Sequence, residues 1–132
     1  MNYIVQEAAS GLTGGLSGEI RINSRPEDLS PLESAIFDRL QSASKWDPVT
    51  RRELVFLTKS SDRKVRDAIA ALRKKHVRVC TSSSRYGYWI AKTEEDYRIL
   101  RGEYISRIKT LATTLAAMDG VVEGQLSWHE LL

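Results

Sequence analysis

The sequence predicts a mainly helical (α+β) domain that carries one small β-hairpin and is followed by a long helix. Three observations lead to this fold class. Helix-start signals stand at Ser30 and Thr50, each followed three residues later by a glutamate. Residues 62–75 place apolar residues at helical spacing, whereas residues 77–91 alternate as strands do. Helical spacing then returns after residue 93, so the expected order is three helices, a hairpin and a fourth helix.

The chain divides into four segments by composition. Residues 1–29 contain a glycine-rich run and no sustained apolar period, so we expect a flexible N-terminal arm. Residues 30–92 form the predicted domain, residues 93–119 the long C-terminal helix and residues 120–132 a tail. A lone cysteine cannot form an internal disulfide, and we find no signal-peptide pattern or membrane-spanning apolar stretch. These features favour a cytoplasmic protein.

The first two helices each begin with a capping box. Ser30 and Glu33 have these roles in the first helix, where Pro31 suits the first helical position. Thr50 and Glu53 have the same roles in the second. We expect the two helices to span residues 31–43 and 51–59. The core residues expected from them are Ile36, Phe37, Leu40, Leu54, Val55 and Leu57.

The third helix, over residues 62–75 with Ser61 as its N-cap, has two distinct faces. At about 100° per residue, one face is apolar. Its members are Val65, Ala68, Ile69 and Leu72. The opposite face holds Arg63, Asp67, Ala70 and Lys74, with Lys64 and Ala71 beside them. The small alanines of this outer face allow the helix axis to approach another surface closely.

The hairpin and the last helix complete the pattern. Residues 77–81 and 86–91 alternate in polarity and are joined by a serine-rich turn that ends in Arg85, near the hairpin tip. The last helix carries an apolar stripe at 4-3 spacing, interrupted upstream by Arg101. The stripe consists of Tyr104, Ile108, Leu111, Leu115 and Met118. It predicts a homodimer seam or packing against the first helix of the same chain, and we favour the dimer.

Positive charge is concentrated in the middle of the chain. Residues 45–92 contain 13 lysine and arginine residues against 4 acidic ones, whereas the segments on either side are each net acidic. The overall net charge of +3 therefore conceals a strongly basic centre. Such an asymmetry favours a polyanionic partner.

Two helices joined by a short turn and followed by a hairpin resemble the winged helix-turn-helix superfamily. The run SDRKVRDAIAALRKK, the strand VRVC with a serine-rich turn, and GYWIA are most similar to small phage- or prophage-type winged-helix proteins. The sequence departs from this pattern at two turns. Lys59 and Ser60 replace the usual glycine and apolar residue, and His76 replaces a common glycine. Histidine tolerates a left-handed backbone better than β-branched residues do.

The resemblance implies a non-catalytic, double-stranded DNA-binding protein that acts in transcription regulation or phage-type DNA replication. The third helix would lie in the major groove, and hairpin 77–91 would be the wing. Arginine pairs with guanine edges and aspartate accepts from cytosine, while helix starts suit phosphates. The implied contact residues are Thr50, Arg51, Arg52, Ser61, Arg63, Lys64, Asp67, Lys74, Arg85 and Tyr86.

Other functions were weighed against this one. The alternative is a winged-helix module for protein–protein interaction, such as a replication accessory protein, whose basic helix docks an acidic partner. Residues 125–128, Gln-Leu-Ser-Trp, partly match the peptides that bacterial replication proteins insert into the sliding clamp. No nucleophile with a base, phosphate loop or metal-ligand spacing is visible, so we expect no enzyme, no metal and no cofactor. Alternating aromatic residues in the hairpin are expected to pack mostly on the core.

Overall fold

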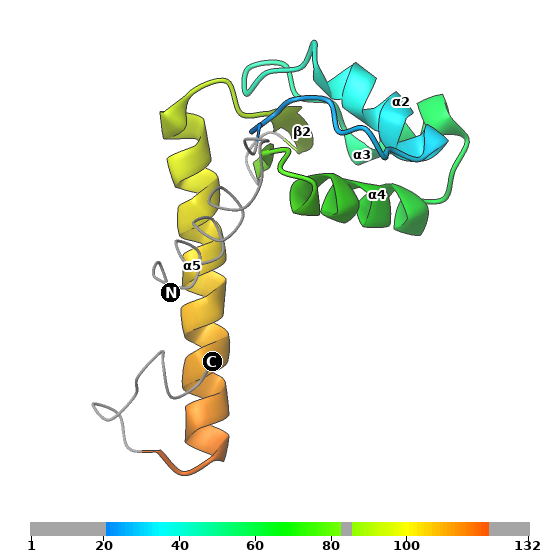
Figure 1. The fold of residues 1–132 in the computed structure, drawn as a ribbon. Helices are drawn as coiled ribbons and strands as arrows, with labels where there is room; N and C mark the ends of the chain where they lie inside the picture. Colours follow the sequence, from blue (N-terminus) through cyan, green and yellow to red (C-terminus); the bar gives the residue numbers. More distant parts are fainter. Residues whose placement is uncertain (1–20, 83–85, 122–132) are drawn as a thin grey trace, which may run out of the picture. The chain divides into compact units, whose positions relative to one another are not determined.

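The computed structural model describes residues 21–82 and 86–121 of the chain of 132 residues. Residues 21–100 form one compact unit, and residues 101–121 belong to another. The elements in order are α2 (Pro31–Leu40), α3 (Arg51–Thr58), α4 (Asp62–Lys74), β1 (Val79–Ser82), β2 (Gly87–Ile90) and α5 (Glu94–Met118). This order of helices and one antiparallel hairpin confirms the mainly helical α+β class (Figure 1).

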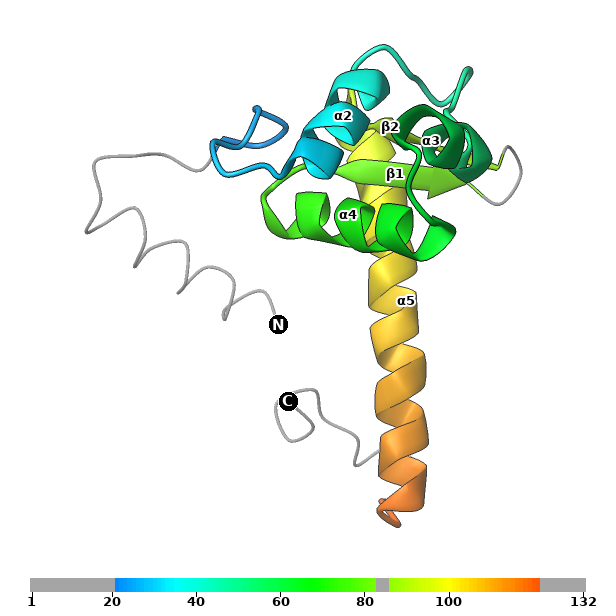
Figure 2. The ribbon, with the colours of Figure 1, turned by 90° about the vertical axis from the view of Figure 1, so that its right-hand side faces the viewer.

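The core of residues 21–100 lies between the first three helices and the hairpin. Helix α4 contacts both α2 and α3, while α2 packs on β2 and α4 on β1 (Figure 2). The predicted apolar face of α4 is the buried one. Its buried residues are Val65, Ala68, Ile69 and Leu72. The 3.6-residue period therefore identified correctly which face of α4 is covered and which is open.

The helix starts follow the sequence signals, with one difference. Ser30 caps α2 in a complete capping box with Glu33. Thr50 caps α3 by accepting the Glu53 amide, but the Glu53 carboxylate pairs with Arg39 at 3.1 Å instead of returning to the cap. The second predicted capping box is therefore only half formed.

Two further expectations for these helices were wrong. Helix α2 ends at Leu40, and Ala43 is buried in the following loop, where its amide donates to the Leu40 carbonyl at 3.1 Å. Leu57 was expected in the core, yet it is 51% exposed. Helix α3 turns Leu54 fully inward. Leu57 lies three residues further along this helix of eight residues, on a side that stays half exposed.

Both unusual turns adopt left-handed backbone conformations. Lys59 ends α3 with φ 53°, and His76 follows α4 with φ 72°. The chain therefore takes the conformation usually given to glycine at both positions where the sequence lacks one. The turns form despite the departures from the common pattern.

The hairpin is tied to a third extended segment. Strand β1 pairs with β2 from Val79↔Ile90 to Ser82↔Gly87. Val49 forms a bridge to Tyr88 through two backbone hydrogen bonds of 2.8 and 2.9 Å. Gly87 is needed here, because a Cβ at this position would lie 2.7 Å from the Pro48 Cβ.

Residues 21–29 are held against the domain, so the predicted flexible arm does not extend to residue 29. Asn23 accounts for most of this attachment. Its side chain donates to the Ala91 carbonyl at 3.0 Å and accepts from the Arg78 amide at 2.7 Å, and its own amide donates to the His76 carbonyl at 2.9 Å. Residues 1–20 of the predicted arm lie outside the described residues.

Helix α5 matches the predicted long helix to within a residue at each end. The Thr93 hydroxyl caps its start by accepting the Asp96 amide at 3.1 Å. At its end, Gly120 has φ 78° and Val121 donates to the Ala116 carbonyl at 2.8 Å, so the predicted stop at residues 119–120 is confirmed. Among the described residues, no helix has both the length and the apolar character needed to cross a bilayer.

The left-handed turn after α4 predicts a stabilising substitution. His76→Gly should raise the free energy of unfolding by about 0.5–1 kcal/mol, because a residue with a Cβ costs about 1–2 kcal/mol in this conformation and glycine loses part of that gain through its more flexible unfolded state. Urea denaturation measures the change. His76→Ala is the control, since it removes the imidazole but keeps the Cβ. Equal stability of the two variants would contradict the backbone explanation.

Candidate nucleic-acid interface

The outer face of α4 is the centre of the candidate interface. Arg63, Asp67, Ala70 and Lys74 are all exposed on it, and Lys64 is exposed beside them. The side chains of Arg63, Lys64 and Lys74 make no ion pair or hydrogen bond with any residue that the structure describes. This face therefore presents cations whose charge is not neutralised within the described chain.

Two more cations without an ion pair come from α3 and the turn after it. Arg52 and Lys59 are exposed, and neither pairs with a carboxylate in the described ranges. Arg52 was among the predicted contact residues, but Lys59 was not. Lys59 follows the last residue of α3 and lies, in a left-handed conformation, in the turn before α4. The basic character of the residue was the only sequence signal for it.

Arg51, in contrast, forms an ion pair within the domain. Its Nε donates to Asp62 Oδ1 at 2.5 Å. Hydrogen bonding to Tyr88, and then pairing with Asp62, raises the pKa of Arg51 above its ordinary value. Asp62 Oδ2 also pairs with Arg66 Nε at 3.2 Å. This arginine therefore links the start of α3 to the start of α4 and to β2, a linkage that the sequence did not reveal.

The two predicted helix-start hydroxyls are used as caps. The Thr50 oxygen accepts the Glu53 amide at 3.0 Å, and the Ser61 oxygen accepts the Lys64 amide at 3.2 Å. Both residues are exposed. Each hydroxyl hydrogen is left to donate, which is the role needed toward a phosphate oxygen.

The hairpin contributes one exposed aromatic residue. Tyr86 is 79% exposed with φ 41°, next to the tip. Arg85, the predicted cation of the tip, lies outside the described residues. Trp89 is 7% exposed and Tyr88 is half-buried against the core, as expected for alternating hairpin aromatics.

Several other basic residues hold the fold together. Arg73 Nε donates to the Val79 carbonyl at 2.9 Å. Arg78 pairs with Glu94 at 3.1 Å and lies 3.7 Å from the centre of the Tyr97 ring. These contacts connect α4 to β1, and the hairpin to the start of α5. Part of the central positive charge is therefore structural.

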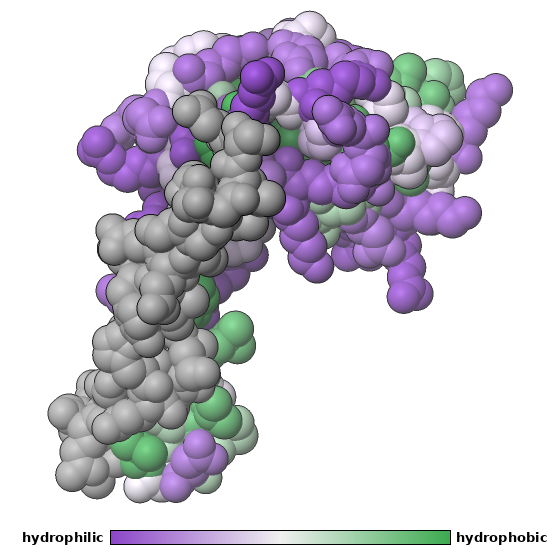
Figure 3. All heavy atoms as spheres, in the orientation of Figure 1, coloured by the Kyte–Doolittle hydropathy of each residue, from purple (hydrophilic) through white to green (hydrophobic). Residues whose placement is uncertain are grey.

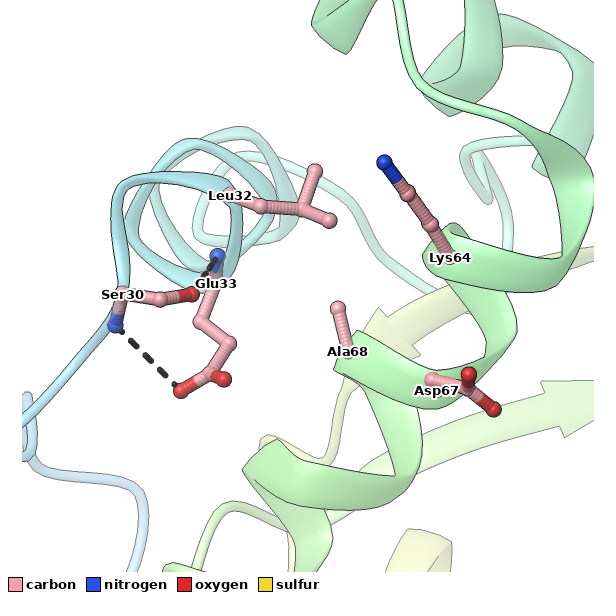
Figure 4. Close-up of a pocket in the computed structure, with 6 residues that line it drawn as sticks. All are labelled: Ser30, Leu32, Glu33, Lys64, Asp67 and Ala68. Atoms are coloured by element: carbon pink, nitrogen blue, oxygen red, sulfur yellow. Dashed lines mark hydrogen bonds between the residues drawn. The ribbon is translucent and has the colours of Figure 1, made fainter.

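A shallow hollow of about 230 Å³ lies between the start of α2 and one side of α4. Its lining residues are Ser30, Leu32, Glu33, Lys64, Asp67 and Ala68 (Figure 4). Leu32 and Ala68 face each other across it, while the Asp67 carboxylate points away from α2. Lys64 lies on the side of α4 that faces α2 across this hollow, and it remains exposed.

Glu33 joins this hollow to the end of α4. Its Oε1 accepts from Lys75 Nζ at 2.6 Å, and Lys75 also donates to the Asp28 carbonyl at 2.9 Å. The hydrogen bond from Lys75 lowers the pKa of Glu33 below its usual value, while burial acts in the opposite direction. The same hydrogen bond raises the pKa of Lys75. The pair therefore joins the start of α2 to the end of α4.

The predicted seam of α5 is open along most of its length. Leu111 and Met118 are 70% and 74% exposed, Leu115 and Tyr104 are less so, and Ile108 is half-buried. Hydrophobic residues are visible on the C-terminal part of α5, while hydrophilic residues dominate around α2 and α4 (Figure 3). An exposed apolar stripe of this kind is typical of a contact surface.

Two further points concern the tail and metal binding. Residues 125–128, the partial clamp-binding match, lie outside the described residues. Within the part of the chain that the structure describes, no three His, Cys, Asp or Glu side chains gather as a metal site. Comparisons of this chain with protein-family models, curated proteins and solved structures found no match.

The Glu33–Lys75 pair predicts a pH-dependent stability difference. Glu33→Gln should lower the free energy of unfolding by about 1 kcal/mol near neutral pH. Because the folded-state pKa of Glu33 is lowered from 4.5, its contribution is present above that unfolded value and is lost as the pH falls through the folded-state pKa.

Urea denaturation at about pH 7 and about pH 3 tests this sign. The wild type and Glu33→Gln should differ at the higher pH and converge at the lower one. A difference that stays constant over this range would show that the ionised pair is not its source.

Proposed function

We propose that residues 21–100 form a winged helix-turn-helix domain that binds double-stranded DNA without catalysis. The observation that carries the proposal is the exposed face of α4, where Arg63, Lys64 and Lys74 have no ion pair within the described residues. The order α3, turn, α4, hairpin supports the winged-helix assignment. The Val49–Tyr88 bridge supports it further, because it joins the segment before α3 to the hairpin.

In the proposed complex, α4 enters the major groove. Arg63 donates to a guanine edge and Asp67 accepts from a cytosine amine, since these pairings match the groove's donors and acceptors. The side chain of Ala70 is a single methyl group, too small to hold the helix away from the bases. Base edges are then read by Arg63 and Asp67 on the outer face of α4.

Phosphate contacts come from the surrounding groups. Arg52, Lys59, Lys64 and Lys74 supply positive charge, and the Thr50 and Ser61 hydroxyls are placed at helix starts. Tyr86 and Arg85 provide the contacts that the wing makes with DNA. The predicted process, transcription regulation or phage-type DNA replication, depends on which sequence is bound and stays a prediction.

The rival function, docking of an acidic protein partner, is favoured by one observation. Phe56 is 86% exposed and Leu57 51% exposed on the outer face of α3, beside Arg52. Exposed apolar residues next to a cation suit an acidic amphipathic protein segment better than a phosphate backbone. In this rival, the basic outer face of α4 would dock the acidic partner, and the exposed apolar residues of α3 would extend the contact.

Binding of mixed-sequence duplex DNA, measured by fluorescence anisotropy, tests the proposed function. If about six phosphates are neutralised, the affinity should fall roughly 10³-fold between about 50 and 200 mM salt. Replacing both Arg63 and Lys74 with alanine should lower the slope of log K against log salt by about 0.9 for each lost phosphate contact. Lys109→Ala, at an exposed lysine of α5, controls for the loss of one positive charge away from the interface.

The outcome separates the two functions. Binding that weakens steeply with salt and depends on Arg63 and Lys74 supports DNA recognition through α4. An absence of binding at the lowest salt would overturn it. In that case the rival function predicts that Phe56→Ser weakens binding of an acidic protein partner.

We further propose that a second copy of the chain covers the exposed stripe of α5. Its apolar residues repeat along two heptads of one helix, which is the pattern of a self-complementary seam. A dimer would suit a two-fold symmetric DNA site with half-sites about one helical turn apart.

Sedimentation velocity tests the dimer. The wild type should sediment with the mass of two chains, and Leu111→Asp should sediment as one, because a charge at a desolvated seam is strongly unfavourable. Thr113→Asp introduces the same charge on another exposed side of α5 and should remain dimeric. A single-chain mass for the wild type at high concentration would contradict the seam.

A further inference from the structure

Asp62 stands out among the residues around the candidate interface because it holds two arginines at once. Its Oδ1 accepts from Arg51 Nε at 2.5 Å, and its Oδ2 pairs with Arg66 Nε at 3.2 Å. The arginines come from two different helices, α3 and α4. Both carboxylate oxygens are therefore occupied at the start of α4.

This cluster is accessible to solvent. The side chains of Arg51, Asp62 and Arg66 are 45%, 50% and 58% exposed. Exposed ion pairs of this kind contribute little to stability and are screened by salt. An anion from solution can therefore compete with the carboxylate.

A DNA phosphate is a suitable competitor. The guanidinium fork binds carboxylate and phosphate with the same geometry, so a phosphate can replace Asp62 on either arginine. The first turn of α4 adds the positive end of its dipole. The other cations of the interface, such as Arg63 and Lys74, have no such internal anion in the described chain.

We propose that Asp62 is a specificity-determining residue that limits sequence-independent affinity for DNA. It occupies Arg51 and Arg66, and thereby removes two potential phosphate contacts from non-specific binding. Non-specific binding comes almost entirely from phosphate contacts, whereas base contacts by α4 are unaffected. Lower non-specific affinity raises the ratio of specific to non-specific affinity for DNA. This inference rests on the proposed DNA-binding function.

The test compares Asp62→Asn with Glu53→Gln on mixed-sequence duplex DNA. Both changes remove one negative charge from an exposed carboxylate that pairs with an arginine. Glu53 pairs with Arg39 of α2, which is outside the candidate interface. Anisotropy titrations at several salt concentrations give the affinity and the salt slope of each variant.

Asp62→Asn should bind the mixed duplex about three- to tenfold more tightly than the wild type, the range expected for releasing two exposed ion pairs. Its salt slope should be steeper by about 0.9 for each arginine that reaches a phosphate. Glu53→Gln should stay within about twofold of the wild type. Replacing Arg51 and Arg66 with glutamine in the Asp62→Asn background should abolish the gain.

Each result has a distinct meaning. If the wild type binds DNA but Asp62→Asn behaves like Glu53→Gln, the inference is overturned while the proposed function stands. If neither the wild type nor any variant binds DNA at low salt, the proposed function itself fails. Urea denaturation of each variant verifies that folding is retained, since Asp62 also lies in the first turn of α4.

Discussion

The packing of one face of α4 is the constraint on which the rest of the structure depends. Val65 and Leu72 are fully buried and Ile69 nearly so, in a core shared with α2, α3 and the hairpin. A helix fixed on this side has no rotational freedom, so the opposite side must be exposed. The placement of Arg63 and Lys74 on the surface therefore follows from the burial of apolar residues that they never touch.

The basic residues divide into two groups according to their partners. Arg73, Lys75 and Arg78 bind carbonyl or carboxylate oxygens and join α4 and the hairpin to their neighbours. Between residues 51 and 74, the cations with neither an ion pair nor a hydrogen bond to a described residue surround the outer face of α4. They are Arg52, Lys59, Arg63, Lys64 and Lys74. The charge excess counted in the sequence is thus larger than the charge offered to a partner.

Features with a local cause could be predicted from the sequence, and features that depend on distant contacts could not. The buried face of α4 and the Ser30 cap follow from spacing and short-range hydrogen bonds. The attachment of Asn23 to the hairpin has no periodic signal, because a single side chain reaches across 68 positions to Ala91. The pairing of Arg51 with Asp62 likewise depends on how α3 meets α4. The sequence therefore predicts which face of α4 is exposed, but it does not predict the ion pairs beside that face.

The distribution of the unpaired cations favours a grooved partner over a flat one. Arg63 and Lys74 are separated by three helical turns, or about 16 Å along α4. Lys64 lies on the side of α4 next to α2, and Lys59 lies in the turn from α3. A partner that contacts all four must reach around the helix. A flat acidic surface contacts only one side, whereas the major groove, about 12 Å wide, places phosphates on both sides of an inserted helix. This geometric requirement is the physical reason to place DNA ahead of an acidic protein.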